Sequence, residues 1–257
     1  MKEVRPLGSE QAQQEGEYWF PYHYVGQFQN DNFKHFYLDT WAINYVSTIE
    51  FLLRKVELDA PQTIIDIGCG DGRFSRELAL ASRDRKVLGV DYSQRAIGLA
   101  TAMNADVENV SFLSLDISGD HELQLFESAI LMEVFEHIPL NSTADFLAGV
   151  RRIIKPGGIL HLTVPHENKP LDDMHYQHFT IEKIRNCLQK NFEVIEVVPF
   201  EKMGISRRVV LKLLSNKFFI LNNSRLLRFI YRYYKNRLFI PCTEENCQRI
   251  YVKAKAL

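Results

Sequence analysis

Short apolar runs alternate with amphipathic segments along most of the chain. Runs rich in β-branched and other apolar residues, typical of strands, occupy residues 63–67, 86–90, 110–115, 128–132, 158–164, 193–198 and 249–254. Helical periodicity, with apolar residues three and four positions apart, occupies residues 36–56, 73–82, 93–104, 143–154 and 181–190. Strands that alternate with helices over this length predict a doubly wound α/β fold. We expect a seven-stranded, mostly parallel sheet with helices on both faces.

The spacing of these segments divides the chain into a core and its flanking parts. We expect an N-terminal lid or helical segment at 1–57, a core at 58–200, a helical insert at 201–247 and the last strand of the core sheet at 248–257. The insert is too long for an irregular loop inside one domain, so it must carry structure of its own. An aromatic cluster at 18–24 suits either packing or a cover over a ligand.

A glycine loop is the clearest chemical signal. The first predicted strand of the core ends in Asp66, and Gly68, Gly70 and Gly72 follow at every second position before a helix begins. Glycines let the backbone turn sharply and approach a ligand without a Cβ in the way. A dinucleotide-binding loop would have its third glycine where Arg73 stands, and no Gly-Lys-Ser/Thr ending marks a phosphate loop. The pattern therefore argues against both of these ligand classes.

The sequence Asp66-x-Gly68-x-Gly70-x-Gly72 resembles the first motif of class I S-adenosylmethionine-dependent methyltransferases, and the resemblance extends over roughly 64–198. It implies that an acid at the end of the second strand accepts both ribose hydroxyls and that its neighbour lies against the adenine. It also implies that an acid after the third strand bonds the adenine amino group; taken alone, that aspartate is typical of a turn. The implied cofactor-binding set is Asp66, Gly68, Cys69, Gly70, Asp91, Tyr92, Asp116 and Ile117.

An acid and histidine cluster follows the fourth strand, where the fourth motif of that family faces the methyl group and its acceptor. It reads Glu133-x-x-Glu136-His137, and His178 lies further along the chain. Histidine changes its charge near neutral pH, so His137 can take a proton from an acceptor hydroxyl. The candidate catalytic residues are therefore His137, Glu136, Glu133 and His178.

The same four residues permit two other interpretations. They resemble the metal-binding set of small-RNA 3′-terminal 2′-O-methyltransferases, and ubiquinone-pathway O-methyltransferases carry a similar Glu-x-x-Glu-His. A divalent cation would accept carboxylate and imidazole ligands. However, the RNA enzymes have a double histidine, whereas Ile138 follows His137 here. We therefore do not favour a metal. In the second interpretation, Glu136 and His137 only bond the backbone and orient a loop.

Charge is unevenly distributed. The 257 residues carry a net charge of -1, which argues against nucleic acid as a partner, yet residues 202–240 hold ten Lys or Arg and no Asp or Glu. Arg225, Arg228, Arg232 and Lys235 share one face of a predicted helix capped by Asn223 or Ser224. Such a basic stripe beside apolar residues suits contact with an anionic membrane surface or a packed insert with its charges in water, and contact with RNA is the third alternative.

We expect methyl transfer from S-adenosylmethionine to an oxygen of a small-molecule, glycan or lipid-linked acceptor. The aromatic cluster at 18–24 resembles N-terminal segments of bacterial methyltransferases from polysaccharide and lipid biosynthesis. The alternatives are a metal-dependent RNA 2′-O-methyltransferase and a non-catalytic adenosyl-binding module. The chain has neither the pattern of a signal peptide nor an apolar run of membrane-spanning length, so we expect a cytoplasmic protein, with peripheral contact to the inner face of a membrane as an option.

Overall fold

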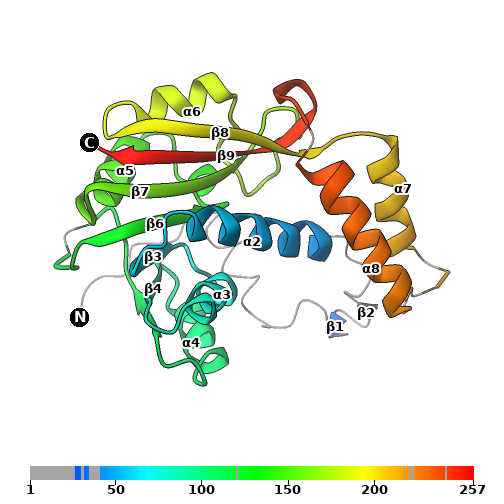
Figure 1. Cartoon of the computed structure of the whole chain (residues 1–257), viewed down its shortest axis with the longest axis horizontal. Coiled ribbons are helices and arrows are strands. Elements are labelled where there is room, and N and C mark those ends of the chain that lie inside the picture. Colours follow the sequence, from blue (N-terminus) through cyan, green and yellow to red (C-terminus); the bar gives the residue numbers. More distant parts are fainter. Residues whose placement is uncertain are drawn as a thin grey trace.

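The computed structural model describes residues 27–29, 32–34, 41–119, 121–216, 218–219, 221, 223–240 and 242–257. Its main feature is a seven-stranded sheet in the order β5-β4-β3-β6-β7-β9-β8 (Figure 1). The strands are β3 Thr63–Ile67, β4 Lys86–Asp91, β5 Val110–Ser114, β6 Phe126–Met132, β7 Ile154–Pro165, β8 Phe192–Lys202 and β9 Cys247–Ala256. Only β9 runs antiparallel to its neighbours in this sheet, β7 and β8. The predicted seven-stranded, mostly parallel sheet is confirmed. A separate hairpin joins β1 Gln27–Gln29 to β2 Asn32–Lys34.

Helices connect the strands of the core as the periodicity predicts. They are α2 Trp41–Glu57, α3 Arg73–Ala81, α4 Gln94–Met103, α5 Thr143–Arg152 and α6 Ile181–Leu188. Two of them begin at side-chain caps: the Ser93 hydroxyl accepts from the amide of Ala96, and the Thr180 hydroxyl accepts from that of Lys183. The aromatic cluster at 18–24 lies outside the described residues.

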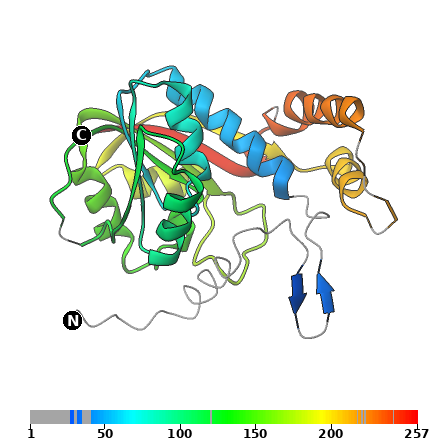
Figure 2. The same cartoon turned by 90° about the horizontal axis from the view of Figure 1, so that it is seen from below.

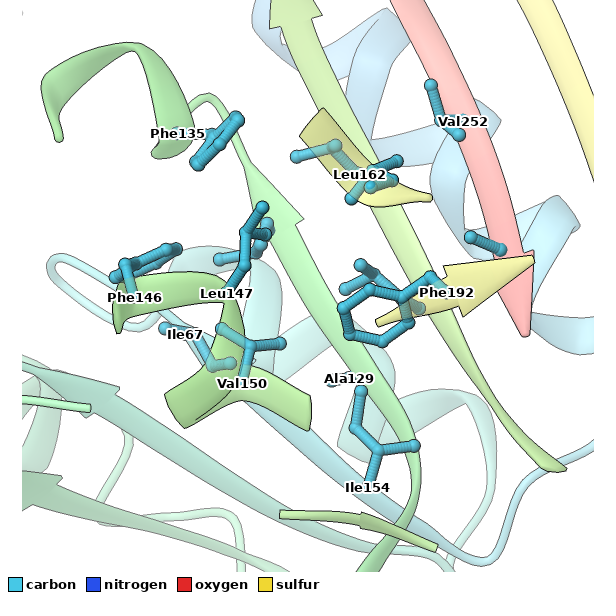
Figure 3. Packing of buried hydrophobic residues seen from close by; sticks show 14 of the residues in the cluster. Ile67, Ala129, Phe135, Phe146, Leu147, Val150, Ile154, Leu162, Phe192 and Val252 are labelled. Carbon is cyan, nitrogen blue, oxygen red and sulfur yellow. The ribbon is translucent and has the colours of Figure 1, made fainter. Parts of the chain in front are cut away.

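Apolar side chains form a core on each face of the sheet. On one face, Phe146, Leu147 and Val150 of α5 pack with Leu162 of β7 and Phe192 of β8 (Figure 3). On the other face, residues of α2 and α3 pack together with residues near the C-terminus of the insert. Both faces of the central strands β3 and β6 are therefore buried, which explains their nearly continuous apolar sequences.

The chain adds strands to the sheet in opposite directions on the two sides of the β3 and β6 pair. From β3 the chain proceeds outward through β4 to β5, whereas β6 and β7 lie on the opposite side of β3. Ligands of open α/β sheets bind at such a switch point, beyond the carboxyl ends of the strands. The loop after β3 holds the glycines and the loop after β6 holds Glu133, so both predicted motifs meet at this edge.

The insert before β9 is helical, as the sequence predicts. It contains α7 Ile205–Leu214, α8 Ser224–Tyr233, the π-helical turn η3 Tyr234–Phe239 and the 3-10 turn η4 Glu244–Asn246. The side chain of Asn223 caps α8. Figures 1 and 2 show α7 and α8 side by side, beyond the ends of the strands. None of the helices in the described ranges has the length and apolar character needed to cross a membrane.

Candidate active site

The glycine loop packs tightly against two neighbouring parts of the sheet edge. Gly68, Gly70 and Gly72 all have positive φ, a conformation that costs little only for glycine. A Cβ on Gly68 would lie 2.5 Å from Val134, and one on Gly72 would lie 2.7 Å from Phe112. Side chains at these positions would push the loop away from both neighbours, so the motif is required by packing as well as by any ligand.

Asp91 holds the glycine loop to the start of α4. One carboxylate oxygen accepts from the Gly70 amide at 3.0 Å, and the other accepts from the Ser93 amide at 2.9 Å. The side chain is 6% exposed. Each carboxylate oxygen can accept a second hydrogen bond, so Asp91 can still bind a ligand hydroxyl. Its predicted contact with ribose stays a prediction.

Carboxylates surround the loop. Asp66 is buried in β3 and accepts a hydrogen bond of 2.6 Å from the Ser75 hydroxyl of α3. Burial raises the pKa of Asp66 to about 7, with a further contribution from the charge of Asp91. The Cys69 thiol is also buried, and its pKa is raised by burial and then by the charges of Asp66, Asp91 and Asp71. An electrostatic field of this sign favours a cationic ligand and disfavours a pyrophosphate.

The other predicted cofactor residues lie on the loops after β4 and β5. Tyr92 is 38% exposed and follows Asp91 directly. Asp116 accepts from the Ser118 amide at 2.9 Å, which is the turn expected of an isolated aspartate. Ile117 packs in the core on the α5 face of the sheet. Contacts of these three side chains with adenine stay predictions.

Two strained carboxylate residues share one guanidinium beside the loop after β6. Glu133 and Glu201 have φ of 57° and 63°, which non-glycine residues adopt at a cost of about 1–3 kcal/mol. Arg249 donates to Glu133 over 2.7 Å and also to Glu201, which accepts from Arg207 of α7 as well. Burial acts to raise the pKa of Glu133, but the nearby Arg249 charge brings it below its ordinary value. Glu133 is therefore held as an anion.

The pKa of Glu136 is raised, whereas that of Glu133 is lowered. It is fully buried, and neither of its carboxylate oxygens has a hydrogen-bond partner among the described residues. Burial raises its pKa well above the ordinary value, and the negative charge of Glu133 raises it further. An unpartnered buried carboxyl is costly unless a ligand, a water or an ion satisfies it. Glu136 therefore points to an occupant of this site.

Backbone carbonyls determine the tautomers of the histidines beside Glu136. The Nδ1 atoms of His137 and His178 lie 2.9 Å from the carbonyl oxygens of Met174 and Lys169. A carbonyl only accepts, so both Nδ1 atoms carry hydrogen and both Nε2 atoms carry a lone pair when the rings are neutral. Burial lowers the pKa of His137, which keeps its ring neutral near pH 7. His137 therefore presents a basic Nε2.

His175 joins this cluster and was missed by the sequence analysis. Its Nδ1 lies 2.8 Å from Nε2 of His178, which must accept, so Nε2 of His175 carries a lone pair. Its ring packs edge-on against His137 with centroids 4.7 Å apart. The predicted residue His178 lies behind His175 and orients it. The sequence signal for this pair is the His-x-x-His spacing.

One group of atoms in this cluster has the geometry of a metal site. The ligand atoms of Glu136, His137 and His175 lie within 4.8 Å of one another. Glu133 and His178, which the metal interpretation of the sequence included, are not in this group within the described residues. Arg249 binds Glu133, and Nε2 of His178 contacts Nδ1 of His175. A carboxylate with two imidazoles suits a divalent transition metal.

A cleft of about 320 Å³ adjoins the cluster at His178. Its lining includes His178, Gln177, Lys169 and the exposed apolar side chains of Leu140 and Leu171. Most of these residues belong to the loop before α6, which the Tyr176 amide ties to the Glu136 carbonyl over 2.9 Å. The cleft offers apolar surface and lysine ammonium groups to an acceptor.

Comparison with known proteins agrees with this geometry. A profile of the methyltransferase domain family matches residues 64–158. The ubiquinone biosynthesis O-methyltransferase of Hydrogenovibrio crunogenus is 27% identical over 123 residues, which cover 47% of this chain and 49% of that protein. The enzyme of the same name from Paraburkholderia xenovorans is 29% identical over 113 residues, covering 42% and 46%. The chain thus matches about half the length of these curated relatives.

Solved structures with the same fold share little sequence with the chain. Magnesium protoporphyrin IX methyltransferase from Synechocystis with bound S-adenosylmethionine superposes with a TM-score of 0.59 at 15% identity, over 98% of this chain and 99% of that one. The N-methyltransferase NodS of Bradyrhizobium japonicum, in complex with S-adenosylhomocysteine, gives 0.54 at 16%, over 83% and 86%. The chain therefore shares the fold of these methyltransferases, and its residues 64–158 match the methyltransferase domain family.

Proposed function

We propose that this protein transfers the methyl group of S-adenosylmethionine to an oxygen of a small-molecule, glycan or lipid-linked acceptor. The observation that carries the proposal is the basic Nε2 of His137, whose tautomer is fixed by the hydrogen bond from Nδ1 to the Met174 carbonyl. His137 lies on the loop after β6, and Val134 of the same loop packs against Gly68 of the glycine loop. A positioned base beside a methyl donor suits the deprotonation of a hydroxyl. The curated relatives are named as O-methyltransferases, which supports an oxygen acceptor.

The residues around the glycine loop fit this donor. S-adenosylmethionine carries a cationic sulfonium and an ammonium group, and the three carboxylates near Cys69 produce a negative potential. Gly68, Gly70 and Gly72 leave the backbone free of Cβ atoms, and Asp91 can accept from the ribose hydroxyls. When bound, the sulfonium supplies a reactive methyl group, so the protein has to supply positioning and proton removal.

His137 is our candidate for the group that removes the proton. As the bond from the methyl carbon to sulfur breaks and a bond to the acceptor oxygen forms, the acceptor proton passes to Nε2 of His137. The sulfur leaves as a neutral thioether. Burial keeps the imidazole neutral beforehand, and the Met174 carbonyl stabilises the imidazolium through Nδ1 afterwards. The neighbouring cleft, with Leu140 and Leu171 exposed at its rim, is our candidate for the acceptor site.

A divalent cation at Glu136, His137 and His175 is a second candidate, favoured by one observation. Both oxygens of the buried Glu136 lack a partner among the described residues, and they lie close to the two imidazoles. A cation would ionise Glu136, occupy the ring lone pairs and orient the acceptor oxygen. In that case His137 would act as a ligand and another group would receive the proton.

Labelled methyl transfer tests the proposal. The purified protein is incubated with S-adenosylmethionine labelled in the methyl group and with a cell extract divided into polar metabolites, lipids and RNA. We expect label in the metabolite or lipid fraction, released by reagents that cleave methyl ethers or esters. The protein with His137→Ala is the matched control. Label in RNA that ribonuclease removes would overturn the choice of acceptor, and cofactor binding without transfer into any fraction would indicate a binding module.

Chelation separates the base from the metal. The reaction is repeated after dialysis against a chelator, and then with added magnesium, manganese or zinc. Unchanged activity supports His137 as the base. Loss of activity that a metal restores, together with equal losses in Glu136→Gln and His175→Ala, supports the cation.

A further inference from the structure

The two helices of the insert repeat one arrangement of side chains. In α7, Arg208 and Lys212 are exposed and basic, Val209 and Leu213 are exposed and apolar, and Val210 is buried. Positions four residues apart lie on the same face of a helix, so α7 carries a basic stripe, an adjacent apolar stripe and a packed face.

The same three faces recur twenty residues later in α8. Arg228 and Arg232 are exposed and basic, Phe229 and Tyr233 are exposed and apolar, and Ile230 is buried in the hydrophobic cluster that also contains residues of α2. Packing against the rest of the protein therefore uses only one face of each helix. The exposed apolar faces have no partner among the described residues of the core.

The exposed basic side chains are free of acidic partners. Within the described part of the chain, no ion pair involves the four basic residues of the two stripes, which are Arg208, Lys212, Arg228 and Arg232. By contrast, Arg207 binds Glu201, and Lys235 binds Glu50 over 2.6 Å. The basic stripe predicted from the sequence included Lys235, and the structure corrects this, because that ammonium group is committed to α2.

The apolar faces of α7 and α8 meet at one place. Ile205, at the start of α7, and Tyr233, at the end of α8, line the same cleft of about 310 Å³. Ile205 is 78% exposed and Phe229 is 66% exposed. In the connection between the helices, Phe218 is 93% exposed. Large apolar side chains gathered at one end of a molecule are typical of an interaction surface, whereas isolated ones are not.

We propose that the exposed faces of α7 and α8 form a docking surface for an anionic phospholipid membrane. Free basic side chains flank apolar ones on both helices, which is the pattern that places cations at headgroup level and apolar residues among the acyl chains. Charge complementarity selects this occupant. A second copy docking through the same face would bring two basic surfaces together, and a nucleic acid would leave the aliphatic and aromatic side chains in water. The proposal does not depend on the methyl-transfer reaction.

Vesicle sedimentation with the full-length protein tests the surface. The vesicles contain phosphatidylcholine with 30% phosphatidylglycerol, or phosphatidylcholine alone. At ~50 mM salt we expect the protein to pellet with the anionic vesicles only, and at ~500 mM salt we expect most of it in the supernatant, because salt screens surface charges. The variant with Arg208, Lys212, Arg228 and Arg232 changed to Gln should partition at least about a hundredfold less.

Two further variants show whether vesicle binding depends on the position of the basic residues and on the exposed apolar side chains. The matched control changes Arg83, Lys86, Arg185 and Lys190 to Gln; these are exposed basic residues of the core with no ion pair in the described chain, and the loss of charge is the same. The control should bind vesicles like the unchanged protein. Phe229→Ser keeps every charge and should bind about tenfold less, because an exposed phenyl ring no longer enters the bilayer. All variants should show unchanged circular dichroism and melting temperature, since the altered side chains are exposed.

Four results would overturn the proposal. The unchanged protein could remain in the supernatant with anionic vesicles at ~50 mM salt. The control could lose as much binding as the insert variant, which would mean that net charge alone is responsible. Finally, light scattering could show a dimer that Phe229→Ser converts to a monomer, or an RNA oligonucleotide could displace the vesicles, which would assign the surface to a second copy or to nucleic acid.

Discussion

Asp66 should make the unfolding free energy of the ligand-free protein depend on pH. This carboxyl is buried in β3, its pKa is raised from an ordinary value of 3.8 to about 7, and burial is the main cause. A carboxyl whose folded-state pKa is raised contributes full stability below pH 3.8 and loses it as the pH rises through 7. The loss amounts to about 2 kcal/mol at pH 5 and about 4 kcal/mol at pH 8.

The substitution Asp66→Asn removes this ionisation and keeps the shape of the side chain. The new amide oxygen can still accept from the Ser75 hydroxyl, which lies 2.6 Å from the carboxylate in the structure. We expect the Asp66→Asn variant to be more stable than the unchanged protein, by about 2 kcal/mol at pH 5 and about 4 kcal/mol at pH 8. Urea unfolding followed by circular dichroism at pH 5, 6, 7 and 8, without ligand, measures the difference.

The Ser75→Ala variant is the control for the direction of the effect. The Ser75 hydroxyl favours the ionised form of Asp66, so its removal should raise the pKa of Asp66 further and move the loss of stability to higher pH. A stability difference between Asp66→Asn and the unchanged protein that stays constant from pH 5 to 8 would refute the reasoning. So would a variant that is less stable at pH 8, because it would mean that ionisation of Asp66 favours the folded protein.

Three other substitutions test the site. Asp91→Ala should weaken S-adenosylmethionine binding by about 1.5–3 kcal/mol in calorimetry, because charge-assisted hydrogen bonds are lost; binding of NAD in place of this ligand would refute our assignment of the loop. His137→Ala should lower turnover about a hundredfold or more with little change in cofactor affinity, and unchanged turnover would remove His137 from the mechanism. Arg249→Met should lower the free energy of unfolding by about 3–5 kcal/mol, because Glu133 and Glu201 lose their shared partner; adding Glu201→Gln should restore part of the loss, and no restoration would contradict this account.

The fold was readable from the sequence because its signals are local. Each of the seven strands of the main sheet overlaps a predicted apolar run, and β3 Thr63–Ile67 has the predicted bounds. Two strands extend four residues beyond their predicted runs: β7 begins at Ile154 where the prediction begins at residue 158, and β8 continues to Lys202 where the prediction ends at residue 198. The extension of β8 shows the cause. The added residues include Glu201 and Lys202, which are polar, and they join the strand because Phe200 pairs with Arg249 and Lys202 with Cys247 of β9. Such pairing depends on a partner strand far along the chain, so no periodicity reports it.

The candidate site likewise has parts that the sequence predicts and parts that only the tertiary structure shows. The glycine loop and the Glu133 to His137 segment each follow a strand directly, so the sequence places them at the carboxyl edge of the sheet. His175 lies on a longer loop, and it reaches the site because that loop folds back until the Tyr176 amide bonds the Glu136 carbonyl. Its tautomer in turn depends on His178 and on the Lys169 carbonyl. The sequence contains all three histidines, but only the tertiary structure shows that His137 is the candidate base, that His175 packs against it and that His178 orients His175.

The charges around Arg249 show why the site and the insert belong to one structural unit. Arg249 stands on β9, Glu133 follows β6, Glu201 ends β8 and Arg207 begins the packed face of α7. The two carboxylate residues adopt positive φ, a strain that the shared guanidinium offsets with charge-assisted hydrogen bonds. A displacement of α7 would therefore disturb Glu201, then Arg249, and through it the anion at Glu133. Since the negative charge of Glu133 raises the pKa of Glu136, this network of ion pairs joins α7 to the cluster around His137.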